Sequence, residues 1–224
     1  DRSVSRGLGD VYKRQEYKYK KQSGGHGQYG HVKMTFEPSG DMDTPYVFEQ
    51  TVVGGAVPKN FFPAVEKGIA ESVKKGPLAA YPVTGIKAVL YDGSYHPVDS
   101  SEMAFKVATQ QAFKKGIMEA KPVLLEPIAT LKVVVPEGYT GDVMGELNKR
   151  RARVMGMNPT DNGYQEIVAD IPYLELYGYN ATLRSMTSGS GTFSYEFARY
   201  EQAPDDVAAK QIEERASKLV EVEE

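Results

Sequence analysis

The chain has 224 residues, of which 41% are hydrophobic and 25% are charged, and this composition is typical of a globular protein with one large or two small domains. The absence of cysteine excludes disulfide bonds and thiolate metal sites, and no apolar run reaches the about 18 residues of a membrane helix, so we expect no membrane partner. The net charge of −3 means that any contact with nucleic acid must come from local basic patches.

Residues 1–15 show neither a hydrophobic period nor an apolar face. Their composition is similar to translated linker or adapter sequence. We therefore expect these residues to form a leader that is disordered or foreign to the fold.

Two alternating segments flank a glycine-rich stretch. Tyrosines alternate with lysines over residues 17–20, and apolar side chains alternate with polar ones over residues 32–37. A period of two on both sides predicts two strands joined by an exposed hairpin loop. Because the loop is polar, we expect it to contact a partner, although a plain glycine turn is the alternative. The loop residues are Ser23, Gly24, Gly25, His26, Gly27, Gln28, Tyr29 and Gly30.

The following segments predict a further strand at residues 46–53 and a helix that starts at Pro58 and stops before Gly76. A strand at residues 83–91 and a second loop at residues 92–98 come next. For the aspartates that flank this loop we expect ordinary structural roles, a turn for Asp92 and an N-cap for Asp99. Asp99 would then begin a helix that runs to about Ala120, with a capping-box glutamate at position 102. Three alanines on one side of that helix predict close packing on a sheet, namely Ala104, Ala108 and Ala112.

A second unit begins near Pro127 and predicts the order βαββαβ, the ferredoxin-like arrangement. Its elements are expected at residues 130–135, 141–151, 153–157, 165–171, 173–186 and 192–200. We expect Phe193, Tyr195 and Phe197 to mark the buried face of the last strand. The tail is predicted as a helix that packs back on the body, because a free helix of this length is marginal in water. Its apolar stripe consists of Ala208, Ile212, Ala216 and Leu219.

Motifs for enzyme chemistry are missing from the sequence. The dipeptide Gly-Lys does not occur, so there is no P-loop, and the Gly25-x-Gly27-x-x-Gly30 pattern is followed by a strand where a dinucleotide site needs a helix. The chain has three histidines, His26, His31 and His96, which are not spaced as metal ligands. No set of nucleophile, base and orienting residue is visible. We therefore expect no enzyme activity and no metal site in this chain.

The two polar loops suggest a contact surface. If they lie together, they form a tip to which the second loop contributes Ser94, Tyr95 and His96. Glycine permits close backbone approach, and amide and imidazole groups can reach 2′-hydroxyls and base edges of RNA. Charge would come from Lys20, Lys21 and Lys33. Alternatively, the tyrosines pack locally and the lysines only solvate the strands.

Several long motifs resemble the fourth and fifth domains of bacterial elongation factor G. Those of the fourth domain are Gln22-Ser-Gly-Gly-His-Gly-Gln-Tyr-Gly-His-Val32, Gly54-Gly-Ala-Val-Pro58, Pro63-Ala-Val-Glu-Lys-Gly68, Tyr91-Asp-Gly-Ser-Tyr-His96, Val98-Asp-Ser-Ser-Glu-Met-Ala-Phe-Lys106 and Lys121-Pro-Val-Leu-Leu-Glu-Pro127. Those of the fifth domain are Gly141-Asp-Val-Met-Gly-Glu-Leu-Asn148 and Leu183-Arg-Ser-Met-Thr187. The resemblance extends from about residue 16 to the C-terminus, in order.

This resemblance implies an α+β fold: an S5-like arm domain, a ferredoxin-like domain and a C-terminal helix. The implied boundaries are residues 16–125 for the arm, 126–203 for the ferredoxin-like domain and 204–224 for the helix, after the leader at 1–15. It also implies that the chain is a fragment of a translational GTPase whose G domain, with its GTP and magnesium, lies elsewhere in the parent.

The resemblance further implies a cytoplasmic, monomeric factor whose partners are the ribosome, with its 16S and 23S rRNA, and the tRNA–mRNA duplex. In this family the arm tip enters the decoding centre during translocation, so residues 23–30 and residues 94–96 would face the duplex. The fifth domain would meet the large subunit near its stalk base.

The chain departs from the family pattern at two positions of the tip. His26 stands where arginine is common, and Pro97 follows His96 where an acidic residue is usual. These departures leave open whether the parent is the main translocase or a paralogue that acts in ribosome recycling or specialised translocation. A stand-alone RNA-binding or interaction protein is a separate alternative.

Overall fold

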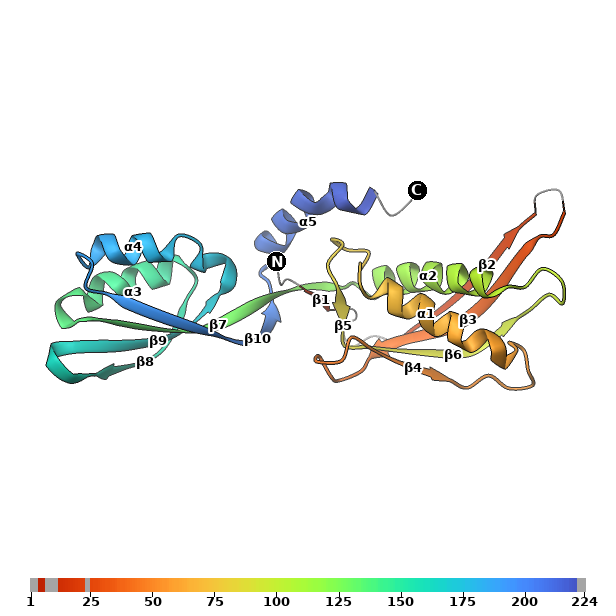
Figure 1. Ribbon diagram of the computed structural model, residues 1–224, viewed down its shortest axis with the longest axis horizontal. Helices are drawn as coiled ribbons and strands as arrows, with labels where there is room; N and C mark the ends of the chain where they lie inside the picture. Colours follow the sequence, from red (N-terminus) through yellow and green to blue (C-terminus); the bar gives the residue numbers. More distant parts are fainter. Residues whose placement is uncertain (1–3, 7–11, 23–24, 221–224) are drawn as a thin grey trace. The chain divides into compact units, whose positions relative to one another are not determined.

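The computed structural model describes residues 4–6, 12–22 and 25–220, which divide into two compact units (Figure 1). The arm unit combines Ser3–Leu124 with Ala203–Glu224, and the βαββαβ unit comprises Leu125–Gln202. The mixed α+β architecture predicted from the sequence is confirmed. Among the described residues, no helix has the length and apolar character needed to cross a membrane.

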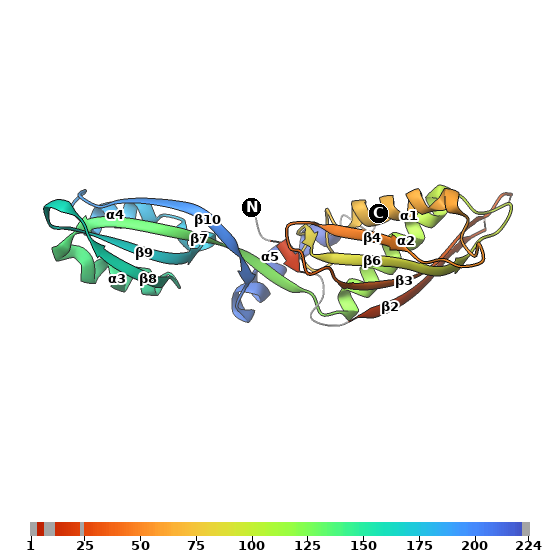
Figure 2. The ribbon, with the colours of Figure 1, turned by 90° about the horizontal axis from the view of Figure 1, so that it is seen from below.

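The arm unit is built on a four-stranded sheet with the order β2-β3-β6-β4. The strands are β2 (Lys13–Lys21), β3 (Gln28–Pro38), β6 (Ile86–Ser94) and β4 (Tyr46–Gln50). The first three are antiparallel, and β4 runs parallel to β6. Two helices, α1 (Phe62–Ser72) and α2 (Glu102–Glu119), lie on one face of this sheet (Figures 1 and 2).

The core of the arm unit forms where the sheet meets α2. The alternating side chains Val32, Met34 and Phe36 are fully buried, and the Phe36 ring meets the Phe113 ring edge-on at 5.7 Å. A methyl group at Gly116 would lie 2.6 Å from the Phe36 ring, so glycine is needed for this approach. The predicted packing of the α2 alanines is confirmed, since all of them are buried: Ala104, Ala108 and Ala112.

The N-terminal boundary predicted from the sequence is wrong in part. β2 begins at Lys13, and Gln15, assigned to the leader, is buried with its amide nitrogen 2.7 Å from Oε2 of Glu119. Tyrosine–lysine alternation starts only at residue 17, so the sequence pattern did not reveal the first residues of this strand. A short strand, β1 (Val4–Arg6), pairs with β5 (Val83–Thr84). Residues 1–3 and 7–11 of the leader lie outside the described residues, and the foreign origin of the leader stays a prediction.

Both helix starts in the arm unit differ from the prediction. Pro58 precedes a short 3-10 turn, η1 (Lys59–Phe61), and α1 starts only at Phe62, with Pro63 in its first turn. The N-cap of α2 is Ser101, whose hydroxyl accepts from the nitrogen of Ala104 at 3.2 Å, so Asp99 is not the cap. Serine and aspartate are equally good caps, and the sequence alone did not choose between them.

The C-terminal helix α5 (Asp205–Val220) belongs to the arm unit, as the packing argument predicts. The Tyr81 hydroxyl donates to Oε1 of Gln211 at 3.0 Å, and the Arg215 guanidinium lies 3.7 Å from the centre of the Tyr81 ring. Of the predicted stripe, Ala208 and Ile212 pack against the arm unit, and Ala216 is exposed. The Leu219 side chain lies outside the described residues. The packing residues are Val207, Ala208 and Ile212, against Ala79, Tyr81, Leu124 and Ala203.

The βαββαβ unit has the predicted element order. Its elements are β7 (Val123–Pro136), α3 (Thr140–Lys149), β8 (Arg153–Pro159), β9 (Tyr164–Pro172), α4 (Tyr179–Met186) and β10 (Thr192–Gln202). Three 3-10 turns connect them, η2 (Glu137–Tyr139), η3 (Asp161–Gly163) and η4 (Tyr173–Leu176). Within this unit the strands pair in the order β10-β7-β9-β8, and each of these pairs is antiparallel. Its core includes the fully buried side chains of Leu131, Leu147 and Ile167.

The expected burial of the aromatic residues on β10 is wrong for two of three. Phe193 packs against Tyr179 with ring centres 5.2 Å apart, but Tyr195 is 51% exposed and Phe197 44% exposed. The three side chains share one face, but β10 is an edge strand of this unit. The rings of Tyr195 and Phe197 contact the Tyr173 ring of η4 and are not covered by an α-helix in the described part of the chain. Alternation predicts a common face but not how far the helices cover it.

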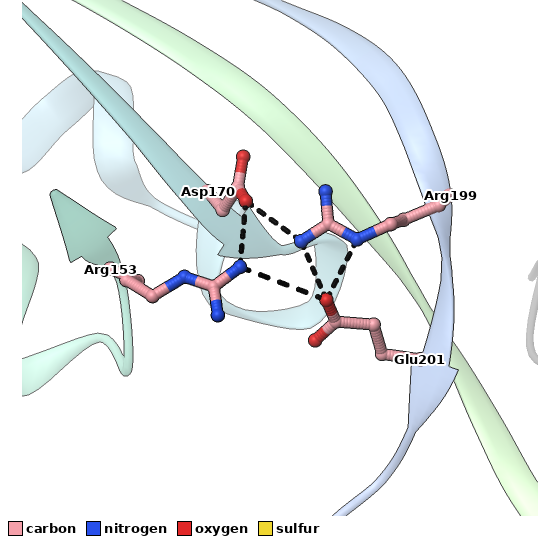
Figure 3. Close-up of polar contacts among 4 residues, drawn as sticks. All are labelled: Arg153, Asp170, Arg199 and Glu201. Atoms are coloured by element: carbon pink, nitrogen blue, oxygen red, sulfur yellow. Dashed lines mark hydrogen bonds and ion pairs between the residues drawn. The ribbon is translucent and has the colours of Figure 1, made fainter. Parts of the chain in front are cut away.

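Four charged residues stabilise the opposite end of β10 (Figure 3). Oδ2 of Asp170 on β9 accepts from Arg199 on β10 at 2.7 Å and from Arg153 on β8 at 3.1 Å, and Glu201 pairs with Arg199. Burial raises the pKa of Asp170, but the two arginine hydrogen bonds outweigh it, and the net pKa is below its ordinary value. The cluster connects three strands of the sheet through side chains.

Candidate functional site

Three loops of the arm unit lie at the same end of its sheet (Figure 1). The first connects β2 to β3, the second connects β6 to α2, and the third connects β4 to η1. Pairing of His31 with Ser94 places the start of β3 level with the end of β6. We call this end the arm tip, and define it by residues 25–30 and 94–100. Of the predicted site residues, Ser23 and Gly24 lie outside the described residues.

Hydrogen bonds join the first and second loops into one surface. Oδ1 of Asp99 accepts from the nitrogen of Gly27 at 3.0 Å, and the carbonyl oxygen of Asp99 accepts from the nitrogen of Tyr29 at 2.8 Å. The Ser100 hydroxyl donates to the carbonyl oxygen of Tyr29 at 3.0 Å. The predicted turn and cap roles of the two aspartates are therefore replaced, since Asp99 connects the loops and Asp92 lies in β6.

The side chains of the second loop are exposed at the tip. Tyr95 is 47% exposed, and the His96 side chain is half exposed. The backbone nitrogen of His96 donates to the Ser100 hydroxyl at 2.9 Å, and its ring lies 6.3 Å from the Tyr29 ring. From the first loop, His26 and Gln28 are exposed as well. Imidazole, phenol and amide groups are thus presented together.

A buried histidine supports the tip from within the sheet. Nδ1 of His31 lies 2.7 Å from Oγ of Ser94, and Nε2 lies 2.7 Å from Oε1 of Glu16. The Ser94 hydroxyl also bonds the Tyr29 hydroxyl at 2.7 Å. These residue types occur in serine hydrolases, but there Nε2 faces the serine and Nδ1 the acid, the reverse of this arrangement. The network instead connects β2, β3 and β6 directly behind the tip.

The glycines of the first loop have different roles. A methyl group at Gly30 would overlap the carbonyl oxygen of Ala104, and one at Gly27 would lie 3.1 Å from Oδ2 of Asp99. Gly25 has a φ of +144° and open space around its Cα. Of these three, Gly25 is therefore the one with open space beside its backbone, Gly30 is required by backbone packing, and Gly27 has tight contacts with Asp99 and with the carbonyl oxygen of Lys21.

The basic residues near the tip are only partly those predicted. Nζ of Lys33 lies 2.9 Å from Oδ2 of Asp92, and this hydrogen bond raises the pKa of Lys33, so its charge is already paired. Lys20 and Lys21 are exposed at the end of β2. Lys18 places its ammonium 5.9 Å from the centre of the Tyr29 ring. Lys18 therefore replaces Lys33 in the basic set of the tip.

Sequence reasoning missed the third loop as part of this end. Val53 is 84% exposed, and Gly54 and Gly55 both have left-handed φ angles, +69° and +71°. Val57 of the same loop is buried close to Gly93. The available signal was the glycine pair directly after an alternating strand, as in the first loop. Among the described residues, no group of three histidine, aspartate or glutamate side chains is placed to hold a metal ion.

Comparisons with known proteins find similar sequences and a similar structure over most of the chain. The profile described as elongation factor G, domain IV matches residues 4–121, and the profile described as elongation factor G C-terminus matches residues 123–211. An elongation factor G-like protein of Thermotoga maritima is 50% identical over 208 residues, which are 93% of this chain and 30% of that protein. A crystal structure from Thermus thermophilus is 42% identical with a TM-score of 0.81, over 96% of this chain and 31% of that one.

The chain therefore spans less than a third of the length of these relatives. The two profiles together cover most of the chain, in the order of the arm unit and the βαββαβ unit. We conclude that the chain belongs to the elongation factor G family and carries domain IV and the C-terminal domain of a translation elongation factor.

Proposed function

We propose that the chain is the ribosome-binding part of an elongation factor G-like GTPase, and that its arm tip promotes translocation by occupying the decoding centre beside the tRNA–mRNA duplex. The parent would act in the cytoplasm as a monomer and carry GTP and magnesium in its G domain. For this chain by itself we propose no enzyme activity, so the purified chain should hydrolyse no GTP.

The proposal rests on the hydrogen bonds that join the first and second loops at the arm tip. Asp99 connects them through Gly27 and Tyr29, so the exposed His96 and Tyr95 have fixed positions relative to the first loop. Side chains of this kind can reach 2′-hydroxyls and base edges in the shallow minor groove of RNA. The exposed lysines at the end of β2 add attraction to phosphates.

The proposed mechanism is a shift of an equilibrium and involves no bond chemistry. A tip that binds the displaced duplex better than the original one lowers the free energy of the displaced state. A preference of about tenfold corresponds to about 1.4 kcal/mol. The tip must be rigid, because a tip that binds the original and the displaced duplex with equal affinity does not shift the equilibrium between them. The βαββαβ unit would contact the large subunit, with 23S rRNA near its stalk base.

A chimera that joins this chain to the N-terminal part of the Thermotoga relative tests the proposal. We expect His96→Ala to slow mRNA movement about tenfold, the effect of losing about 1.4 kcal/mol in the rate-limiting state, while GTP hydrolysis stays nearly unchanged. Asp43→Ala is the control, because Asp43 is exposed before β4, at the other end of the sheet. Equal rates of mRNA movement for wild type and His96→Ala would remove His96 from the mechanism.

A role in ribosome recycling is the second candidate. It is favoured by the two departures of the tip from the common family pattern, at His26 and Pro97. The same chimera separates the two roles, because a recycling factor splits post-termination ribosomes without moving mRNA. A stand-alone RNA-binding protein is a third alternative, and a reading frame upstream with a P-loop motif would exclude it.

A further inference from the structure

The two ring nitrogens of His96 are not equivalent. Nδ1 lies 3.3 Å from the backbone nitrogen of Val98 and 3.1 Å from that of Asp99. A backbone N–H group can only donate, so Nδ1 must present a lone pair to both. From these partners we assign the proton of the neutral ring to Nε2. The ring therefore offers a partner one polar hydrogen, on Nε2, and the loop itself uses the other nitrogen.

Asp99 holds this arrangement in place. Its backbone nitrogen donates to the His96 ring, while its side chain and carbonyl accept from Gly27 and Tyr29 of the first loop. Oδ2 of Asp99 lies 3.4 Å from Nδ1 of His96, where a neutral ring has no proton to give it. The Asp99 side chain is mostly buried, whereas that of His96 is half exposed. One residue thus sets both the shape of the second loop and its distance from the first.

On the basis of the proposed function, we propose that His96 contacts RNA as a neutral hydrogen-bond donor through Nε2, and that Asp99 is the positioning residue for this contact. The group recognised is an acceptor atom of the RNA at the tip: a phosphate oxygen, a 2′-hydroxyl oxygen or an acceptor on a base edge. A neutral donor contributes direction to the contact, while the lysines of β2 contribute the charge.

The tautomer is measured first, in the free 224-residue chain. Nitrogen-15 NMR of the imidazole side chains is readily assigned, because the chain has only three histidines. We expect the signal of His96 to be that of the tautomer protonated on Nε2 at pH 7. Asp99→Asn retains an oxygen that accepts from Gly27, so it should hold the second loop in place and preserve this signal. Asp99→Ala loses that bond to the first loop. The backbone nitrogen of residue 99 should then be held less firmly against Nδ1 of His96, and the two tautomers should mix. A His96 that is mainly protonated on Nδ1, or charged, overturns the proposal.

Binding to small ribosomal subunits that carry mRNA and tRNA is measured second. Asparagine at position 96 retains an acceptor close to the place of Nδ1 but has no donor at the place of Nε2, and glutamine has the reverse. We expect His96→Asn and His96→Ala to weaken binding by about three- to tenfold, and His96→Gln to recover part of it.

The outcomes separate the two proposals. Wild-type affinity of the His96→Asn variant would mean that His96 only shapes the loop, and the proposed donor role would be wrong. Failure of the wild-type chain to bind small subunits at any salt concentration would contradict the proposed function itself. In that case the NMR result still decides whether Asp99 sets the tautomer of His96.

Discussion

The Cα of Gly30 faces the carbonyl oxygen of Ala104 at the start of α2, with no room between them for a methyl group. Both partners are backbone, so neither can move aside as a side chain would. This contact packs the start of β3 directly against the first turn of α2. The position of the arm tip therefore depends on one glycine that no ligand needs to touch.

We expect Gly30→Ala to destabilise the arm unit by about 1–3 kcal/mol, the usual cost of forcing an extra methyl group into a packed site. Unfolding in denaturant followed by NMR measures the two units separately. Gly141→Ala is the control, because a methyl group there meets no atom within 4 Å, and it should raise stability by no more than about 1 kcal/mol. Equal effects of the two substitutions would contradict the assigned packing role.

The salt dependence of binding should separate free from paired lysines at the tip. Lys20→Gln removes an exposed charge and should lower the slope of log affinity against log salt by about 0.7–0.9 for small subunits. The matched control is the double variant Lys33→Gln, Asp92→Asn, which removes an ion pair with a Nζ–Oδ2 distance of 2.9 Å and leaves the net charge unchanged. We expect no change of slope for it. A larger effect of the double variant would place the RNA over the middle of the sheet.

The charged cluster of the βαββαβ unit should make stability depend on pH. The pKa of Asp170 is lowered in the folded protein, so its ionisation stabilises the fold above its unfolded pKa of about 3.9. This stabilisation is lost as the pH falls through the lower folded value. We expect Asp170→Asn to cost about 1–2 kcal/mol at pH 7, because both arginine partners are partly exposed and solvent weakens the pairs.

The difference between wild type and Asp170→Asn should shrink as the pH falls below about 4. Glu201→Gln serves as the control, since that carboxylate is exposed and its loss should cost less than about 1 kcal/mol. Thermal unfolding between pH 2 and pH 7 measures both variants. A pH-independent difference for Asp170→Asn would assign its cost to packing instead of charge.

Strand and helix order was predictable because it depends on local periodicity. Val32, Met34 and Phe36 are buried as their alternation indicates, and the α2 alanines face the sheet as their spacing indicates. Exposure along β10 was not predictable, because it depends on where neighbouring helices end. The start of α2 was ambiguous, because Asp99 and Ser101 are both good caps and the choice depends on a contact with the first loop.

For the candidate site, sequence reasoning identified the residues of the tip but not the bonds that join them. Asp99 and Gly27 are 72 positions apart, and only the fold brings them within hydrogen-bond distance. Lys33 is close to the first loop in sequence, which suggests a free charge at the tip, yet a cross-strand carboxylate pairs with it. Pairings between distant segments are decided by strand register, which composition does not reveal.

Directed hydroxyl-radical probing tests whether the joined loops face the decoding centre. The chain lacks cysteine, so Tyr95→Cys and the control Asp43→Cys each provide one attachment site for an iron chelate. With small subunits that carry mRNA and tRNA, we predict cleavage of 16S rRNA around the decoding site from position 95 and none there from position 43. Cleavage at the decoding site from position 43 but not from position 95 would show that the joined loops do not face the decoding centre.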